Sequence, residues 1–144
     1  MLRIAALVLV VAVFAVPPAR AQDAEPSEAD RAAIQNVIAG QLRAFLDDDG
    51  PRAYGFAAPG IQLIFPNHAV FMAMVRQGYA PIYRSVETEF RDITALAQGR
   101  WLQQVLIVGA NGEVVLALYT MERQPDGTWK IAGCTIARTN EATT

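Results

Sequence analysis

The sequence predicts an α+β fold, three helices followed by a meandering antiparallel sheet. In the first half of the chain apolar residues recur at helical spacing, and after Tyr83 the period changes to two. Two turn signals, Asn111-Gly112 and Pro125-Asp126-Gly127, separate the later segments as hairpin loops do. A chain of 144 residues is the size of one domain. These observations favour helices first and a sheet afterwards within a single unit.

The first predicted helix starts near Ser27, where Ser27 and Asp30 resemble a capping box. Its buried stripe consists of Ile34, Val37, Ile38, Leu42, Phe45 and Leu46, and it runs for about five turns. The acidic run from Asp47 to Gly50 is expected to be a solvated stop. It is not a calcium loop, which alternates its ligands and adds a later glutamate.

A second, shorter helix is expected from Pro51 through Phe56, ended by Pro59-Gly60. Ile61 to Phe65 reads as a short apolar strand, and a third helix should run from Pro66-Asn67 to Gly78. The later segments give four strands, which we expect at Val86–Ala97, Arg100–Ala110, Glu113–Arg123 and Thr128–Arg138.

The N-terminus has the features of a secretory signal. Arg3 precedes an apolar run from Ile4 to Val16, and Ala19-Arg20-Ala21 has the form that signal peptidase accepts. The alternative, a membrane anchor, would need about 20 apolar residues. We therefore expect cleavage after Ala21 and a periplasmic or secreted protein without a membrane partner. The expected organisation is a signal peptide over 1–21, a linker over 22–27, one domain over 28–138 and a tail over 139–144.

Composition excludes several classes of function. The formal net charge of −2 gives no electrostatic footprint for nucleic acid. Cys134 is the only cysteine and His68 the only histidine, so neither an intrachain disulfide nor a zinc site of the usual ligands can be built. No phosphate loop or dinucleotide fingerprint occurs. We expect no metal and no cofactor, a solvated His68 at the start of the third helix, and a buried, inert Cys134.

The two turns predict a register. A two-residue loop at Asn111-Gly112 would place Gln104 opposite Tyr119, and a three-residue loop at Pro125–Gly127 would place Tyr119 opposite Gly133. The candidate pocket is this row, closed by two tyrosines that follow the third helix, and its residues are Gln104, Tyr119, Gly133, Tyr79 and Tyr83. The alternative is that Gly133 is a bend in a curved strand and the tyrosines belong to an ordinary core.

Both faces of this predicted sheet are mostly apolar, which is unusual for a sheet with one wet face. Three helices can cover only one face, so the other is expected to form a homodimer interface. The alternative is that the N-terminal arm or a loop covers it. Glu122 and Lys130 should face each other near Trp101 as a cross-strand ion pair that stabilises the hairpin.

Three segments carry a family resemblance. Asp126–Ile131 resembles the last-strand D-G-x-W-x-I pattern of nuclear transport factor 2-like, or SnoaL-like, domains. The segments 71–79 and 119–127 resemble a narrower family of small secreted bacterial proteins that remains a domain of unknown function. The resemblance implies a curved sheet that wraps the helices into a cystatin-like cone. It carries no known activity, and no motif transfers catalytic roles to particular residues.

The expected function is non-catalytic: the domain binds a small, largely apolar molecule or acts as a protein-interaction module. The alternative is a small lyase, isomerase or hydrolase that uses Tyr119 or Tyr83 with Asp92 or Glu122. The predicted register places both carboxylates on the face opposite Tyr119, which favours binding over catalysis. A purely structural domain without a cavity is the third possibility.

Overall fold

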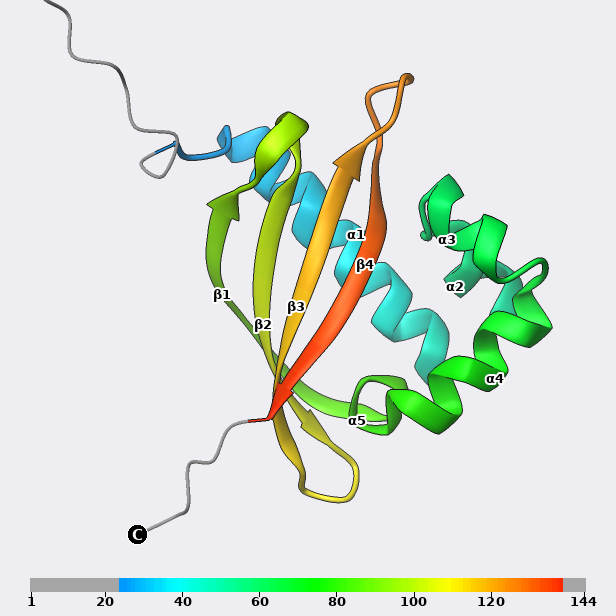
Figure 1. The fold of residues 1–144 in the computed structure, drawn as a ribbon. Helices are drawn as coiled ribbons and strands as arrows, with labels where there is room; N and C mark the ends of the chain where they lie inside the picture. The colour runs from blue at the N-terminus through cyan, green and yellow to red at the C-terminus, as the bar shows by residue number, and fades with distance from the viewer. Residues whose placement is uncertain (1–23, 139–144) are drawn as a thin grey trace, which may run out of the picture.

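A computed structural model describes residues 24–138 of the chain. The expected signal peptide and the expected C-terminal tail lie outside the described residues. Within them, five α-helices precede a four-stranded antiparallel sheet of order β1-β2-β3-β4 (Figure 1). The helices are α1 (Glu28–Leu46), α2 (Gly50–Gly55), α3 (Pro59–Ile64), α4 (His68–Gly78) and α5 (Ala80–Tyr83). The strands are β1 (Ser85–Ala95), β2 (Trp101–Gly109), β3 (Val114–Arg123) and β4 (Trp129–Arg138), and a 3-10 turn, η2 (Ala97–Gly99), joins β1 to β2.

The α+β class, the long first helix and the four-stranded meander are confirmed. Ser27 Oγ accepts a hydrogen bond from the backbone N–H of Asp30 at 3.0 Å, so the predicted cap starts α1. Asn67 caps α4 in the same way, through the N–H of Val70 at 2.9 Å. Both helices therefore begin at the side chains that their sequences provide.

The predicted strand over Ile61–Phe65 is wrong, because these residues lie largely within α3. Pro59 stands in the first turn of α3, where its missing N–H costs nothing, so it starts a helix instead of ending one. α2 accordingly ends at Gly55. The apolar run of α3 is not a buried strand: none of its residues is buried. α5, which the sequence pattern does not predict, is a single turn that places Pro81 and Ile82 in the core.

The predicted register between β2 and β3 is wrong by one residue. The loop has three residues, because the N–H of Gly109 donates to the carbonyl of Glu113 at 2.8 Å. Of the loop residues only Gly112 has a positive φ, of 81°, whereas the two-residue type I′ turn requires positive φ at both central positions. Gln103 therefore lies opposite Tyr119, and Gln104 is on the other face.

The register between β3 and β4 starts as predicted, with Glu122 opposite Lys130, and then shifts at a bulge beyond Ile131. At Ile131 the edge of β4 also pairs with the chain between α2 and α3. The N–H of Ala58 donates to the carbonyl of Ile131 at 2.8 Å, and the N–H of Ile131 donates to the carbonyl of Phe56 at 2.9 Å. Beyond this bulge Cys134, not Gly133, lies opposite Tyr119.

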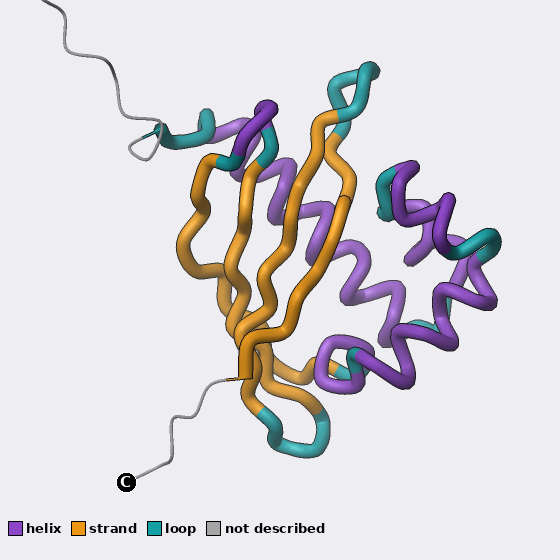
Figure 2. Tube along the Cα trace, viewed as in Figure 1, coloured by secondary structure: helices purple, strands orange, loops and turns teal. Residues whose placement is uncertain are grey.

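The core lies between the helices and one face of the sheet, here called the inner face. The helices are gathered on this side, and α1 runs across it (Figure 2). The inner face contributes the buried side chains of Val105, Ile107, Val115, Ala117, Tyr119, Met121, Trp129 and Ile131. Among residues 24–138, no helix is both long and apolar enough to cross a membrane.

Candidate functional site

A cavity of about 420 Å³ lies between β4, the end of α1 and the α3–α4 segment. In Figure 1, α3 and α4 stand across from β4, and residues of all three elements contribute to the cavity wall. Its lining is almost entirely apolar and consists of Gln41, Phe45, Ile61, Ile64, Phe65, Phe71, Met74, Val75, Tyr79, Ile82, Tyr119, Ile131, Ala132, Gly133 and Cys134. An apolar concavity with few polar groups is the usual form of a small-molecule site.

Tyr119 supplies the polar group at the inner wall. The residue is 1% exposed, and within the described part of the chain its hydroxyl has no hydrogen-bond partner of normal geometry. Its neighbour is the Cys134 thiol, which hydrogen-bonds only weakly. Burial is the main reason that the pKa of Tyr119 lies well above its ordinary value of 10.0. Tyr119 is therefore a neutral hydroxyl that can donate to a bound molecule.

Two further groups at this wall are also held neutral. Burial raises the pKa of the Cys134 thiol from 9.0 to about 12, although the residue as a whole keeps some exposure. Tyr79 has a raised pKa for the same reason, and its hydroxyl donates to the backbone carbonyl of Cys134 at 3.0 Å. The wall thus carries no charge at neutral pH, and Cys134 is not an activated nucleophile.

Three of the five candidate pocket residues line the cavity, namely Tyr79, Tyr119 and Gly133. Gln104 does not, because the register places it on the outer face of the sheet. Gly133 contributes backbone only. A Cβ built on it would lie 4.0 Å from the Cβ of Thr120, the residue opposite it in the register, so a side chain here would point away from Tyr119.

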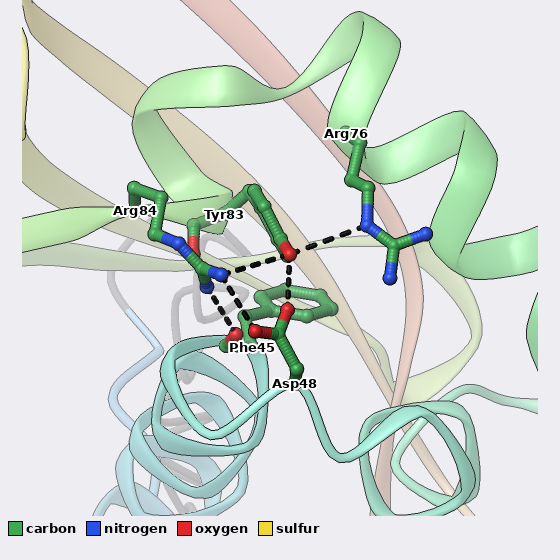
Figure 3. A network of polar contacts seen from close by, with 5 residues as sticks. All are labelled: Phe45, Asp48, Arg76, Tyr83 and Arg84. Atoms are coloured by element: carbon green, nitrogen blue, oxygen red, sulfur yellow. Dashed lines mark hydrogen bonds and ion pairs between the residues drawn. The ribbon is translucent and has the colours of Figure 1, made fainter.

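Tyr83, the fifth candidate, lies outside the lining and organises a polar network instead (Figure 3). Its hydroxyl donates to Asp48, and it accepts from Arg84 Nη2 at 2.9 Å and from Arg76 Nε at 3.2 Å. Arg84 also donates to the Phe45 carbonyl at 2.6 Å and pairs with Asp48 at 2.8 Å. The Tyr83 hydrogen bond is the main reason that the pKa of Asp48 is lowered.

This network fixes the end of α1 against α4, α5 and the start of β1. Asp48 has a positive φ of 51°, a conformation that Asp tolerates better than most residues, and this turns its carboxylate toward Tyr83. The ring of Phe45, a cavity-lining residue, meets the Tyr83 ring at 6.4 Å in an edge-on arrangement. The network therefore holds one end of the cavity wall in place.

Gln103 is the buried polar residue that the corrected register brings to the inner face. It is fully buried, and its Nε2 donates to the carbonyls of Gln104 at 2.8 Å and Arg91 at 3.0 Å. The Arg91 carbonyl lies where β1 departs from regular pairing. Gln103 therefore supplies hydrogen bonds to backbone carbonyls where the sheet is irregular, and it does not line the cavity.

Sequence reasoning missed most of the helical half of the wall. Phe71 and Val75 of α4 and Phe45 of α1 belong to the buried apolar faces of their helices, and such faces give no sign of a void beside them. Gln41 had a readable signal, because it stands three residues after Ile38 on the buried face of α1. Its Nε2 donates to the Ala53 carbonyl at 3.1 Å, which ties α1 to α2.

The other polar residues that the sequence singled out, Glu122, Lys130 and His68, do not line the cavity. Glu122 faces Lys130 as expected, but Lys130 Nζ donates to the Gly55 carbonyl at 2.7 Å. His68 is exposed in the first turn of α4. Between residues 24 and 138, no three His, Cys, Asp or Glu side chains come together in a way that could hold a metal ion.

Fold and cavity together define the class: a small α+β domain with an apolar pocket between its sheet and its helices. The chain belongs to the family described as Domain of unknown function (DUF4864), whose model matches residues 27–144. No curated protein matches the chain, and no solved structure matches it.

Proposed function

We propose that this domain binds a small, largely apolar molecule in the cavity and that the Tyr119 hydroxyl is its polar anchor. The main support for this proposal is that the Tyr119 hydroxyl is fully buried and has no hydrogen-bond partner among the described residues, at the wall of a largely apolar cavity. A buried polar group that lacks a hydrogen bond costs about 1–3 kcal/mol, and a bound acceptor would remove that cost. A water molecule takes up about 30 Å³ of the liquid, so the cavity has the volume of about 14 water molecules.

The lining favours binding over catalysis. None of the lining residues carries a carboxyl or an imidazole. The polar groups that they offer are the hydroxyls of Tyr79 and Tyr119, the Cys134 thiol and the Gln41 amide, and the rest of the wall is apolar. The tyrosine–carboxylate contact that the fold does form, between Tyr83 and Asp48, lies outside the lining. Hydrogen bonding and exclusion of water are the chemistry that this wall supplies.

The test has two parts: a search for a ligand that copurifies with the protein, and a probe-binding assay on a variant whose cavity is filled. Native mass spectrometry of the protein recovered from its producing cell should show added mass that is lost on denaturation. The apolar fluorophore 1-aminoanthracene should bind the wild-type chain and should fail to bind Cys134→Phe, whose ring would occupy the space beside Tyr119. Gly133→Ala is the matched control, because its methyl group would lie on the Thr120 side of β4. Equal binding by folded Cys134→Phe would contradict the proposal.

We also propose that the outer face of the sheet forms a homodimer interface. Its centre is partly exposed and, apart from Gln104, apolar; the apolar residues are Leu102, Leu106, Val108, Leu116, Leu118 and Ala137. Glu87 and Glu89 border it on β1 and Thr135 on β4, which gives an apolar centre with a polar rim. Because the described helices lie on the inner side, a second copy of the chain is the partner that matches this face.

We also propose that the protein is exported and that its fold belongs to the nuclear transport factor 2-like superfamily. The apolar run before Ala21 supports export by a cleaved signal, so the cavity would work in the periplasm or outside the cell. The order of helices and meander supports a nuclear transport factor 2-like cone. N-terminal sequencing of the mature protein tests the first point, and an experimental structure compared with that superfamily tests the second.

A further inference from the structure

The rim of the cavity on α3 exposes large apolar side chains. Ile64 lines the cavity and is nevertheless 70% exposed, and Leu63 beside it is 86% exposed. In the first turn of α4, Val70 is 44% exposed. Proteins leave neighbouring apolar groups of this size in water where something docks on them.

The helical segment that carries this rim contains basic residues and no acidic ones. From residue 50 to residue 86 the chain contains three arginines and no Asp or Glu, although the whole chain has a net charge of −2. Arg84 is paired with Asp48, and Arg76 Nε donates to Tyr83 in the same network. Arg52 on α2 and Arg76 on α4 are nevertheless exposed, on the helices that precede and follow α3 in the chain. An apolar edge flanked by arginines matches a surface with negative headgroups above a hydrocarbon interior.

We propose that α3 and the first turn of α4 dock on an anionic lipid bilayer, and that the cavity takes its apolar ligand from that bilayer. The second half of this proposal rests on the proposed function. Leu63 and Val70 enter the acyl boundary, Arg52 and Arg76 meet the headgroups, and the cavity opens beside Ile64 toward the lipid. A short helix without buried residues suits this contact, because its apolar groups are already free to insert.

The test is flotation of the exported protein with vesicles of phosphatidylglycerol and phosphatidylethanolamine, and with vesicles of phosphatidylcholine alone. The wild-type protein should float with the anionic vesicles and much less with the neutral ones. The double variant Leu63→Ser/Val70→Ser should bind the anionic vesicles about tenfold more weakly or worse, because it removes two inserting side chains. Arg52→Gln should reduce the preference for anionic lipid.

The matched control is Leu46→Ser/Val86→Ser, which removes two apolar side chains that are 43% and 62% exposed and line a different part of the surface. It should float as the wild type does. Neither Leu63 nor Val70 lines the cavity, so binding of 1-aminoanthracene by their double variant should be unchanged.

Each result decides one part. Docking on lipid is overturned if the wild type fails to float or if Leu63→Ser/Val70→Ser floats equally well. A rim that binds a protein partner instead of lipid would give one of these two results. If 1-aminoanthracene still binds, the proposed function stands without it. Flotation that depends on Leu63 and Val70, with no probe binding by the wild type, keeps the docking surface and overturns the cavity.

Discussion

Tyr119 on β3 lies directly opposite Cys134 on β4, and both residues line the cavity. A bulge beyond Ile131 produces this pairing, at the point where the 56–58 segment joins the edge of β4. The contact between two distant parts of the chain thus accompanies the alignment of two of the polar groups of the wall. The Tyr119 hydroxyl gains only a thiol as neighbour, which leaves it available to a ligand.

Replacing Tyr119 with phenylalanine should separate stability from binding. The change removes an unpartnered hydroxyl and keeps the ring, so the free energy of unfolding should stay level or rise by about 1 kcal/mol. Binding of 1-aminoanthracene, whose amine can pair with the hydroxyl, should weaken by about fivefold to tenfold. Urea denaturation and fluorescence titration measure the two quantities.

Tyr54→Phe is the control with the opposite expectation. The Tyr54 hydroxyl donates to the Phe65 carbonyl and lies outside the lining, so its loss should cost about 1 kcal/mol of stability and leave probe binding unchanged. If the two variants behave alike in both assays, Tyr119 has no special role.

Stability should fall at alkaline pH. The Cys134 thiol has a pKa of about 12 in the folded chain and 9.0 when unperturbed, so above pH 9 the unfolded chain releases a proton that the folded chain retains. The unfolded state then binds fewer protons, and the free energy of unfolding should decline by about 1.4 kcal/mol per pH unit up to about pH 12. Tyr119, whose pKa is also raised, adds to the decline above pH 10.

Cys134→Ala isolates the thiol contribution to this decline. Urea unfolding of both proteins at several pH values above 8 should give a shallower loss for the variant, because the thiol contribution is then absent and the raised pKa values of Tyr79 and Tyr119 remain. Parallel curves would show that the thiol ionises equally in both states of the wild-type chain.

How well the sequence predicts this site depends on how far apart in the chain the interacting residues lie. Ser27 and Asn67 act on N–H groups three residues away, and both helix starts were predictable. The sequence of the loop at Asn111-Gly112 suits both a two-residue and a three-residue turn. Only the φ of Asn111, which the sequence does not show, decides between them.

The bulge after Ile131 depends on a contact with Ala58, more than 70 residues away in the chain, and no local pattern signals it. This single shift places Cys134, in place of Gly133, opposite Tyr119. Tyr119 was found because its position on the inner face depends only on the alternation within β3. The cavity itself was unpredictable in extent, since core and cavity wall have the same apolar composition.

The proposed dimer should come apart when charge is placed at the centre of the outer face. Leu116→Glu puts a carboxylate among the partly exposed leucines of β2 and β3, which a dry interface cannot accommodate. At micromolar concentration, light scattering should give the wild type twice the mass of one chain and the variant a single chain. Val70→Glu, on the helical side, should remain dimeric. A wild-type protein with the mass of one chain would contradict the proposal.

Gly109 at the end of β2 should tolerate no side chain. A Cβ there would lie 2.9 Å from the backbone Cα of Pro81 in α5, and backbone cannot move aside as a side chain does. Gly109→Ala should lower the free energy of unfolding by about 1–3 kcal/mol, measured by urea denaturation. It should also weaken 1-aminoanthracene binding, because pushing α5 outward moves Ile82 at the cavity wall. Gly55→Ala, with no heavy atom within 4 Å of the added Cβ, should change neither quantity by more than about 1 kcal/mol. Full stability and binding in Gly109→Ala would show that α5 is not held against β2 as closely as this contact requires.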